Sequence, residues 1–265
     1  MPLAALGDWH VYYEEHGDGD PVLLVNGLGA DHLAWGLQTE AFRERHRVIV
    51  FDNPGVGQTT GPAGPYTTEL FADVAAGLLR HLGVERAHVV GASLGGAIAQ
   101  QLALRHPELV RTLSLHGTWG RADGHLTAIV RSWQTYARAV SLLELCRQCW
   151  LWVFTVWWYN DRPDDMARLE RQVEEAPYPQ TAAAFCDQAE ACVTHDVLDR
   201  LGEVAVPTLL TVGDRDMLTP AHHTYAIRDR IPHARVRVWQ KMGHAPFWEI
   251  PEEFNRVQLE FMEEQ

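Results

Sequence analysis

Apolar runs and stretches of helical periodicity alternate along the chain from His10 to about His116, and the alternation resumes at Pro207. Short apolar runs bounded by glycine, proline or polar residues are typical of buried strands. The runs that fit this description span residues 22–25, 48–51, 89–92, 110–115, 207–213 and 234–239. Because helical segments separate them, the pattern predicts an α/β domain.

Between Trp119 and His195 the pattern changes, because this stretch keeps helical periodicity but contains no clear strand followed by a turn. It lies between the strands predicted at 110–115 and 207–213, so it interrupts one domain rather than following it. The 265 residues, of which 46% are hydrophobic, can bury one substantial core. We therefore expect a single domain with a helical insertion.

Residues 89–96 read Val-Val-Gly-Ala-Ser-Leu-Gly-Gly, which places the pattern Gly-x-Ser-x-Gly between a strand and a helix-forming segment. A serine on so tight a turn has a strained backbone, so the residues two before and two after it, Gly91 and Gly95, must be small. The turn exposes the Ser93 hydroxyl and puts the Leu94 N–H at the positive end of the following helix. The pattern predicts Ser93 as a nucleophile and Leu94 as an oxyanion donor.

An exposed serine needs a base to take its proton and a carboxylate to orient that base. The strand at 207–213 runs into a turn that contains Asp214 and Asp216, and the strand at 234–239 leads to His244. Open α/β sheets place their chemistry in the loops after strands. His244 is therefore the predicted base, and Asp214 and Asp216 compete for the role of the acid.

Five motifs together make the chain similar to members of the α/β-hydrolase superfamily over nearly its whole length. They are Asn26-Gly27-Leu28-Gly29, Asp52-Asn53-Pro54-Gly55-Val56-Gly57, the turn around Ser93, the turn at 213–220, and Gly243-His244. The resemblance implies a mostly parallel central sheet flanked by helices, with a helical cap insertion. It assigns residues 1–118 and 196–265 to the core and 119–195 to the cap, or lid.

The same resemblance selects among the candidate site residues. The family order of nucleophile, acid and base matches Ser93, Asp216 and His244. The spacing of Asp216 within its turn is also that of the family, which favours it over Asp214. These three residues form the expected catalytic triad.

The resemblance also implies a second oxyanion donor beside Leu94. Family members commonly have His-Gly at the first motif, and the N–H of the residue after that glycine completes the oxyanion hole. This chain has Asn26 in place of the histidine, so the donor carried over is Leu28. The replacement leaves the hydrogen bonding of that loop open.

Within the superfamily the chain resembles small bacterial esterases and 3-oxoadipate enol-lactonases. This likeness implies a serine hydrolase that cleaves a small, largely apolar carboxylic ester or lactone through an acyl-enzyme, with no metal or organic cofactor. Serine at position 93 argues against epoxide hydrolases and haloalkane dehalogenases, which have aspartate there. A carbon–carbon bond hydrolase, a thioesterase, a lyase using the same triad, and a non-enzymatic small-molecule receptor stay open.

Six of the ten tryptophans lie in the predicted cap. Packing of the cap onto the core accounts for such crowding, but ligand sites are also lined mainly by hydrophobic and aromatic side chains. Both interpretations can hold together. The residues that we expect to line the substrate pocket are Trp119, Trp133, Trp157 and Trp158.

The net charge of −13 argues against nucleic acid as a partner, because such a surface repels a polyanion. The first ten residues show no secretory signal, and the apolar run at 149–159 is shorter than the roughly 20 residues of a membrane span. We expect a cytoplasmic protein that acts on a small molecule, with a homo-oligomer left open.

Two other pairs of reactive side chains are interpreted as non-catalytic. Cys146 and Cys149 lie in a leucine-rich helical stretch without the context of a redox site, so we expect them to pack. His222 and His223 stand near a helix start with no cysteine or histidine at ligand spacing nearby. The sequence therefore predicts no metal site.

Overall fold

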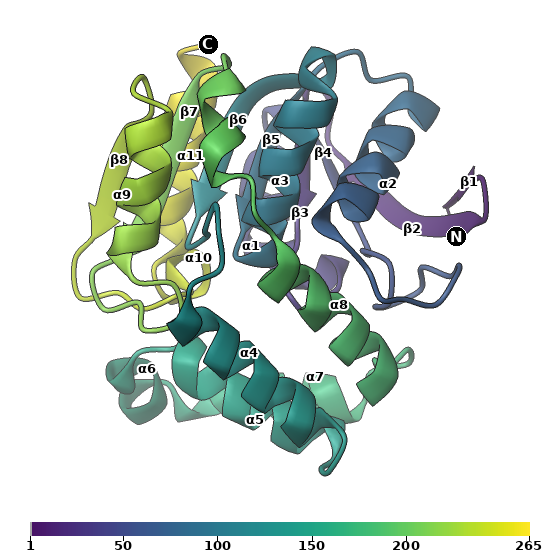
Figure 1. Ribbon diagram of the computed structural model, residues 1–265, viewed down its shortest axis with the longest axis vertical. Coiled ribbons are helices and arrows are strands. Elements are labelled where there is room, and N and C mark those ends of the chain that lie inside the picture. Colours follow the sequence, from purple (N-terminus) through teal and green to yellow (C-terminus); the bar gives the residue numbers. More distant parts are fainter. Residues whose placement is uncertain (1) are drawn as a thin grey trace.

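The computed structural model describes residues 2–265, and over these residues one eight-stranded sheet runs through the molecule in the order β1-β2-β4-β3-β5-β6-β7-β8 (Figure 1). The strands are β1 Leu3–Leu6, β2 Trp9–His16, β3 Asp20–Val25, β4 His46–Phe51, β5 Ala87–Ala92, β6 Val110–His116, β7 Thr208–Gly213 and β8 Arg235–Trp239. β2 pairs antiparallel with both β1 and β4, whereas β4, β3, β5, β6, β7 and β8 pair parallel in that order. This confirms the mostly parallel sheet expected from the sequence.

Each face of the sheet has its own cover of helices. The helices outside the insertion are α1 Gly36–Phe42, α2 Thr68–His81, α3 Leu94–Arg105, α9 Ala221–Arg230, α10 Pro246–Glu249 and α11 Pro251–Glu263. Leu23 and Val25 of β3 join a core cluster with α2 and α3, whereas Val22 and Leu24 join a second cluster with α1 and α11. Since both faces are buried, the central strands appear in the sequence as continuous apolar runs.

In the described part of the chain, five α-helices lie between β6 and β7: α4 Gly124–Ala137, α5 Leu142–Val153, α6 Val156–Asp161, α7 Pro163–Glu174 and α8 Ala182–Thr194. Figure 1 shows α4 to α7 gathered beside the sheet, with α8 running back toward the core. A short antiparallel bridge between Arg121 and Asp196 joins the two ends of this insertion. The helices fall within residues 119–195, and the division into core and cap stays a prediction; Met1 lies outside the described residues.

The cysteines are buried or half-buried and unpaired in the described residues. Burial raises the pKa of the Cys146 thiol to about 11, and burial likewise raises the pKa of Cys149. Thiols in this state are poor nucleophiles at neutral pH, which agrees with a packing role. Over residues 2–265, none of the helices has the length and apolar character that crossing a membrane requires.

Candidate active site

Ser93 stands between the end of β5 and the start of α3 with φ 56° and ψ −123°, a left-handed conformation that non-glycine residues rarely adopt. A Cβ on Gly91 would collide with the Gly95 carbonyl oxygen, and a Cβ on Gly95 would collide with the Val25 carbonyl oxygen. The turn therefore requires glycine on both sides of the serine. This is the backbone strain expected from the Gly-x-Ser-x-Gly pattern.

The backbone of Ser93 is held on both sides. Its N–H donates to the His116 carbonyl at 2.9 Å, and its own carbonyl accepts the Thr118 hydroxyl at 2.8 Å. These bonds tie the turn to the last residue of β6 and to the loop that follows it. They fix the direction of the serine side chain without using its hydroxyl.

Asp216 and His244 come together at the carboxyl ends of β7 and β8, where His244 Nδ1 donates to Asp216 Oδ2 at 2.8 Å. Asp216 Oδ1 accepts two backbone N–H bonds, from Leu218 at 2.9 Å and Thr219 at 2.8 Å. Burial alone would raise the pKa of Asp216, but the charge of His244 and these hydrogen bonds hold that pKa below its usual value. Asp216 is therefore a charged, fully bonded carboxylate that orients the imidazole.

Asp214, the competing acid, is exposed, and its side chain makes no hydrogen bond to this pair within residues 2–265. Its backbone N–H bonds the Trp239 carbonyl at 3.0 Å, which places it on the β8 side of the turn. Of the two aspartates, only Asp216 contacts His244 in the described residues.

His244 Nδ1 faces Asp216 and the Thr219 hydroxyl, which leaves Nε2 without a hydrogen-bond partner among residues 2–265. Gly117, with φ 50°, packs against the pair: a Cβ there would lie 3.0 Å from His244 Cε1 and 3.2 Å from Asp216 Oδ2. The backbone of Ser93 is near this pair in the fold, because its N–H bonds the carbonyl of the residue before Gly117. The hydrogen bond from a serine to such an imidazole often tightens only when substrate binds.

His116 is a buried residue of this site that the sequence analysis did not identify. Its Nε2 donates to the His244 carbonyl at 3.0 Å, and its Nδ1 accepts from the Thr211 hydroxyl at 2.7 Å. Burial and the neighbouring charge of His244 lower the pKa of His116 to about 4, so it is neutral at pH 7. The signal that could have found it is its position at the carboxyl end of β6, beside the strand that leads to Ser93.

The predicted oxyanion donors lie on either side of Ser93. Leu94 opens α3, and its N–H belongs to the first turn, which has no intrahelical acceptor. The loop that carries Leu28 packs on the serine, because a Cβ on Gly27 would lie 3.3 Å from the Ser93 Cβ. Among the described residues neither N–H bonds another group.

Asn26, which replaces the family's usual histidine, is buried and bonded. Its Nδ2 donates to the Phe51 carbonyl at 3.4 Å, and its carbonyl accepts from Asn53 Nδ2 at 3.2 Å. These bonds link the ends of β3 and β4. The asparagine thus anchors the loop that contains Leu28. This answers how that loop is hydrogen-bonded, which the sequence had left open.

Gln188 of α8 joins the predicted cap to the loops around the site and was also missed. Its Oε1 accepts the Gly29 N–H at 3.1 Å, and its Nε2 donates to the Pro54 carbonyl at 2.7 Å. Gln188 is fully buried. A single cap side chain therefore positions the residue next to Leu28.

The four tryptophans predicted to line the pocket have different surroundings. Trp119 and Trp133 are buried in the larger core cluster. Trp158 is buried and stacks on Phe154, with ring centroids 5.4 Å apart, whereas Trp157 is half-buried. Their role toward a substrate stays a prediction.

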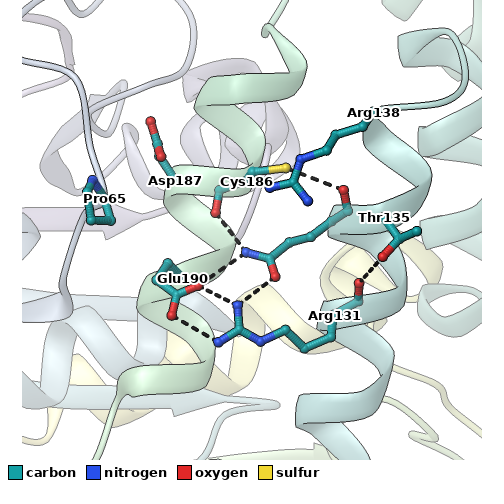
Figure 2. A pocket seen from close by; sticks show the side chains of 8 residues that line it. Pro65, Arg131, Thr135, Arg138, Cys186, Asp187 and Glu190 are labelled. Atoms are coloured by element: carbon teal, nitrogen blue, oxygen red, sulfur yellow. Dashed lines mark hydrogen bonds and ion pairs between the residues drawn. The ribbon is translucent and has the colours of Figure 1, made fainter.

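A cavity of about 530 Å³ lies between α4, α8 and the loop of Pro65 (Figure 2). Several of its polar side chains bond one another: Arg131 forms an ion pair with Glu190, and Gln134 donates to the Cys186 carbonyl at 3.0 Å. It contains none of the predicted site residues. It is therefore separate from the candidate active site.

Outside this site, Asp123, His222 and His223 offer donor atoms within 4.8 Å of one another and could hold a metal ion. Sequence spacing could not bring Asp123 together with the two histidines, because 99 positions separate Asp123 from His222.

Residues 20–251 match the family described as alpha/beta hydrolase fold, and the chain belongs to this family. Among relatives, the chain is 34% identical over 262 residues, covering 98% of each, to "Putative carbamate hydrolase RutD" of Azorhizobium caulinodans. It is 29% identical to the 2-hydroxy-6-oxo-6-phenylhexa-2,4-dienoate hydrolase of Comamonas testosteroni, covering 97% of this chain and 92% of the relative. The enol-lactonase structure from Burkholderia xenovorans superposes with a TM-score of 0.90 at 23% identity, covering 98% and 99%, which shows a shared fold. Together these comparisons support a hydrolase.

Proposed function

We propose that this protein is a serine hydrolase that cleaves a small, largely apolar carboxylic ester or lactone. The observation that carries the proposal is the hydrogen-bonded pair of Asp216 and His244 at the carboxyl ends of β7 and β8. Ser93, strained at a positive φ, bonds the carbonyl of the residue before Gly117, and Gly117 packs against that pair. Strain of this kind persists where function uses it. A fully buried acid bonded to a histidine is the arrangement that activates a neighbouring serine.

In the proposed reaction His244 Nε2 takes the proton of the Ser93 hydroxyl as the oxygen attacks the substrate carbonyl. The resulting oxyanion is bound by the free N–H groups of Leu28 and Leu94. The tetrahedral intermediate collapses, the leaving alcohol receives the proton from His244, and an acyl-enzyme remains. Water then attacks the acyl carbon with His244 again as base, which releases the acid and restores Ser93.

The cap supports the apolar character of the proposed substrate. Trp157 is half-buried in the first turn of α6 and packs against the cluster that contains Ala245, the residue after His244. An aromatic side chain that is not fully covered near the base can contact an acyl or alcohol group. Trp119, Trp133 and Trp158 are the other proposed pocket residues.

Carbamate cleavage is the second candidate, and the relative from Azorhizobium caulinodans favours it by name. A carbamate has a carbonyl that Ser93 could attack in the same way, with an amine or alkoxide as leaving group. Carbon–carbon bond hydrolysis is favoured in the same manner by the relative from Comamonas testosteroni. The triad serves all three bonds, so the substrate must be tested directly.

The experiment compares initial rates on p-nitrophenyl butyrate, a γ-lactone, an N-alkyl carbamate ester and a vinylogous 1,5-diketone. We expect kcat/KM to be highest for the ester or the lactone, and Ser93→Ala to lower it by roughly four to six orders of magnitude. A fluorophosphonate should add covalently to the wild type and not to Ser93→Ala. Turnover by the variant above about a tenth of the wild-type rate at an unchanged Tm would remove Ser93 from the mechanism.

A further inference from the structure

Asp123 stands at the start of the cap with one carboxylate oxygen available. Its Oδ1 caps α4 by accepting the Leu126 N–H at 2.8 Å. The other oxygen, Oδ2, faces the first turn of α9, where it lies 2.9 Å from His222 Nε2 and 3.4 Å from His223 Nε2. Two imidazoles from one helix therefore converge on one oxygen from another.

His223 supplies an independent observation at the same place. Its side chain is 5% exposed, and its Nε2 makes no hydrogen bond within residues 2–265. Buried polar atoms in folded proteins are nearly always paired, so an unpaired imidazole nitrogen aimed at a carboxylate points to a missing partner. A hydrogen bond between His222 and Asp123 satisfies only His222.

We propose that Asp123, His222 and His223 bind a divalent transition-metal ion, with Zn²⁺ as the reference ion. Ligand distances of roughly 2.0–2.2 Å place the donors of a tetrahedral zinc site about 3.4 Å apart. The 3.4 Å between His223 Nε2 and Asp123 Oδ2 already has this value, and the 2.9 Å contact of His222 needs a small opening. Two imidazoles and one carboxylate favour zinc, cobalt or nickel over magnesium and calcium.

The surroundings leave room for a fourth ligand. His222 is 58% exposed, so solvent reaches the site on its side and a water molecule can complete the coordination. The two imidazole rings lie 4.1 Å apart at 34°, which lets both Nε2 atoms point the same way. His125, in the first turn of α4, instead packs edge-to-face against Trp152, with ring centroids 6.1 Å apart, and serves as a natural control.

The position of the site gives the ion a structural consequence. Asp123 follows Arg121, whose bridge to Asp196 closes the base of the insertion. The two histidines lie on α9, the helix that follows the turn of Asp216. A bound ion would therefore link the start of the predicted cap to α9, the core helix that follows Asp216 in the chain. This inference does not rest on the proposed hydrolase function.

The test uses the full chain, freed of metal with a chelator and carrying no histidine tag, titrated calorimetrically with ZnCl₂. We expect one strong Zn²⁺ site per chain in the wild type, weakened at least tenfold in His222→Ala and in Asp123→Asn. Asparagine is also a good N-cap, so Asp123→Asn keeps the start of α4 intact. His125→Ala should bind Zn²⁺ like the wild type.

Two further readouts complete the experiment. Zn²⁺ should raise the Tm of the wild type and of His125→Ala but not that of His222→Ala, because a ligand stabilises only the state that binds it. Co²⁺ should give the visible absorption of tetrahedral coordination in the wild type but not in His222→Ala or Asp123→Asn. The assignment would be overturned if the wild type and His222→Ala bound Zn²⁺ with equal affinity. It would also be overturned if His125→Ala lost as much Zn²⁺ affinity as His222→Ala.

Discussion

The Nε2–H of His116 donates to the backbone carbonyl of His244 across 3.0 Å, so one buried histidine holds the main chain of another. The second nitrogen of His116 is occupied by the Thr211 hydroxyl at 2.7 Å. His116 thus links β7 and the His244 loop from its place on β6. It positions the proposed base without contacting the reacting atoms.

Replacing His116 with phenylalanine should lower kcat about 10- to 100-fold with little change in KM, because small displacements of a base slow the chemical step. The unpaired His244 carbonyl should also cost about 1–3 kcal/mol of unfolding free energy. His116→Gln retains a side-chain N–H and should recover part of kcat. Wild-type kcat in His116→Phe would show that the hydrogen bond has no positioning role.

Asp216→Asn should lower kcat about 10⁴-fold, because asparagine favours the wrong imidazole tautomer. Asp214→Asn is the matched control, since Asp214 is exposed and does not contact His244. Initial rates at pH 8 with the best substrate, together with Tm values, measure both. The reverse ranking would assign the acid to Asp214.

Stability should fall as the pH is lowered from about 6.5 to 4, because buried histidines must take up protons on unfolding. Burial lowers the pKa of His116 and of His195 to about 4, below the unfolded value near 6.5. The unfolded chain binds more protons between these values, so the stabilisation is complete above pH 6.5 and is lost toward pH 4. Each histidine should account for about 2 kcal/mol between pH 7.5 and 5.

Urea unfolding at pH 7.5 and pH 5 measures this loss. His195→Gln removes one of the titrating groups, whose Nδ1 lies 2.9 Å from the Thr68 hydroxyl. The variant should therefore lose less free energy of unfolding between the two pH values than the wild type does. An identical loss in both proteins would assign the pH dependence to other groups.

The sequence predicted the central strands well because their pattern is local. Residues 22–25 and 48–51 are buried on both faces, and both strands end at glycine-rich loops that mark the edge of the sheet. The outer strands β1 and β2 were not identified individually. They are partly exposed, so their runs are short and interrupted by polar residues.

The supporting contacts of the site were missed for a different reason. Gln188 lies 159 positions from Gly29, and His116 lies 128 positions from the His244 carbonyl that it binds. Glutamine and histidine carry no periodic signal, and nothing within one segment shows which distant backbone atom a side chain will meet. The strained turn at Ser93 could be predicted because its constraint, glycine on both sides, is contained within five residues.

Gln188→Met should lower kcat about 10- to 100-fold, because methionine keeps the volume but frees the Gly29 N–H and the Pro54 carbonyl beside the oxyanion loop. Gln134→Met is the control. It loses a bond to the Cys186 carbonyl at 3.0 Å but none to the loop of Leu28. Steady-state kinetics should show a larger kcat loss in Gln188→Met than in the control. Equal losses would show that Gln188 does not position the proposed oxyanion hole.

The last prediction distinguishes packing from substrate contact among the cap tryptophans. Trp133 and Trp158 are buried, so replacing either with alanine should lower the unfolding free energy by about 3–5 kcal/mol. Trp157 is half-buried, and Trp157→Ala should instead change the preference between short and bulky esters by about 1–3 kcal/mol. Ratios of kcat/KM for p-nitrophenyl acetate and benzoate, with urea unfolding, measure both effects. If all three variants lose stability while the kcat/KM ratio for the two esters stays unchanged, the tryptophans only pack the cap. The argument for an apolar substrate then fails.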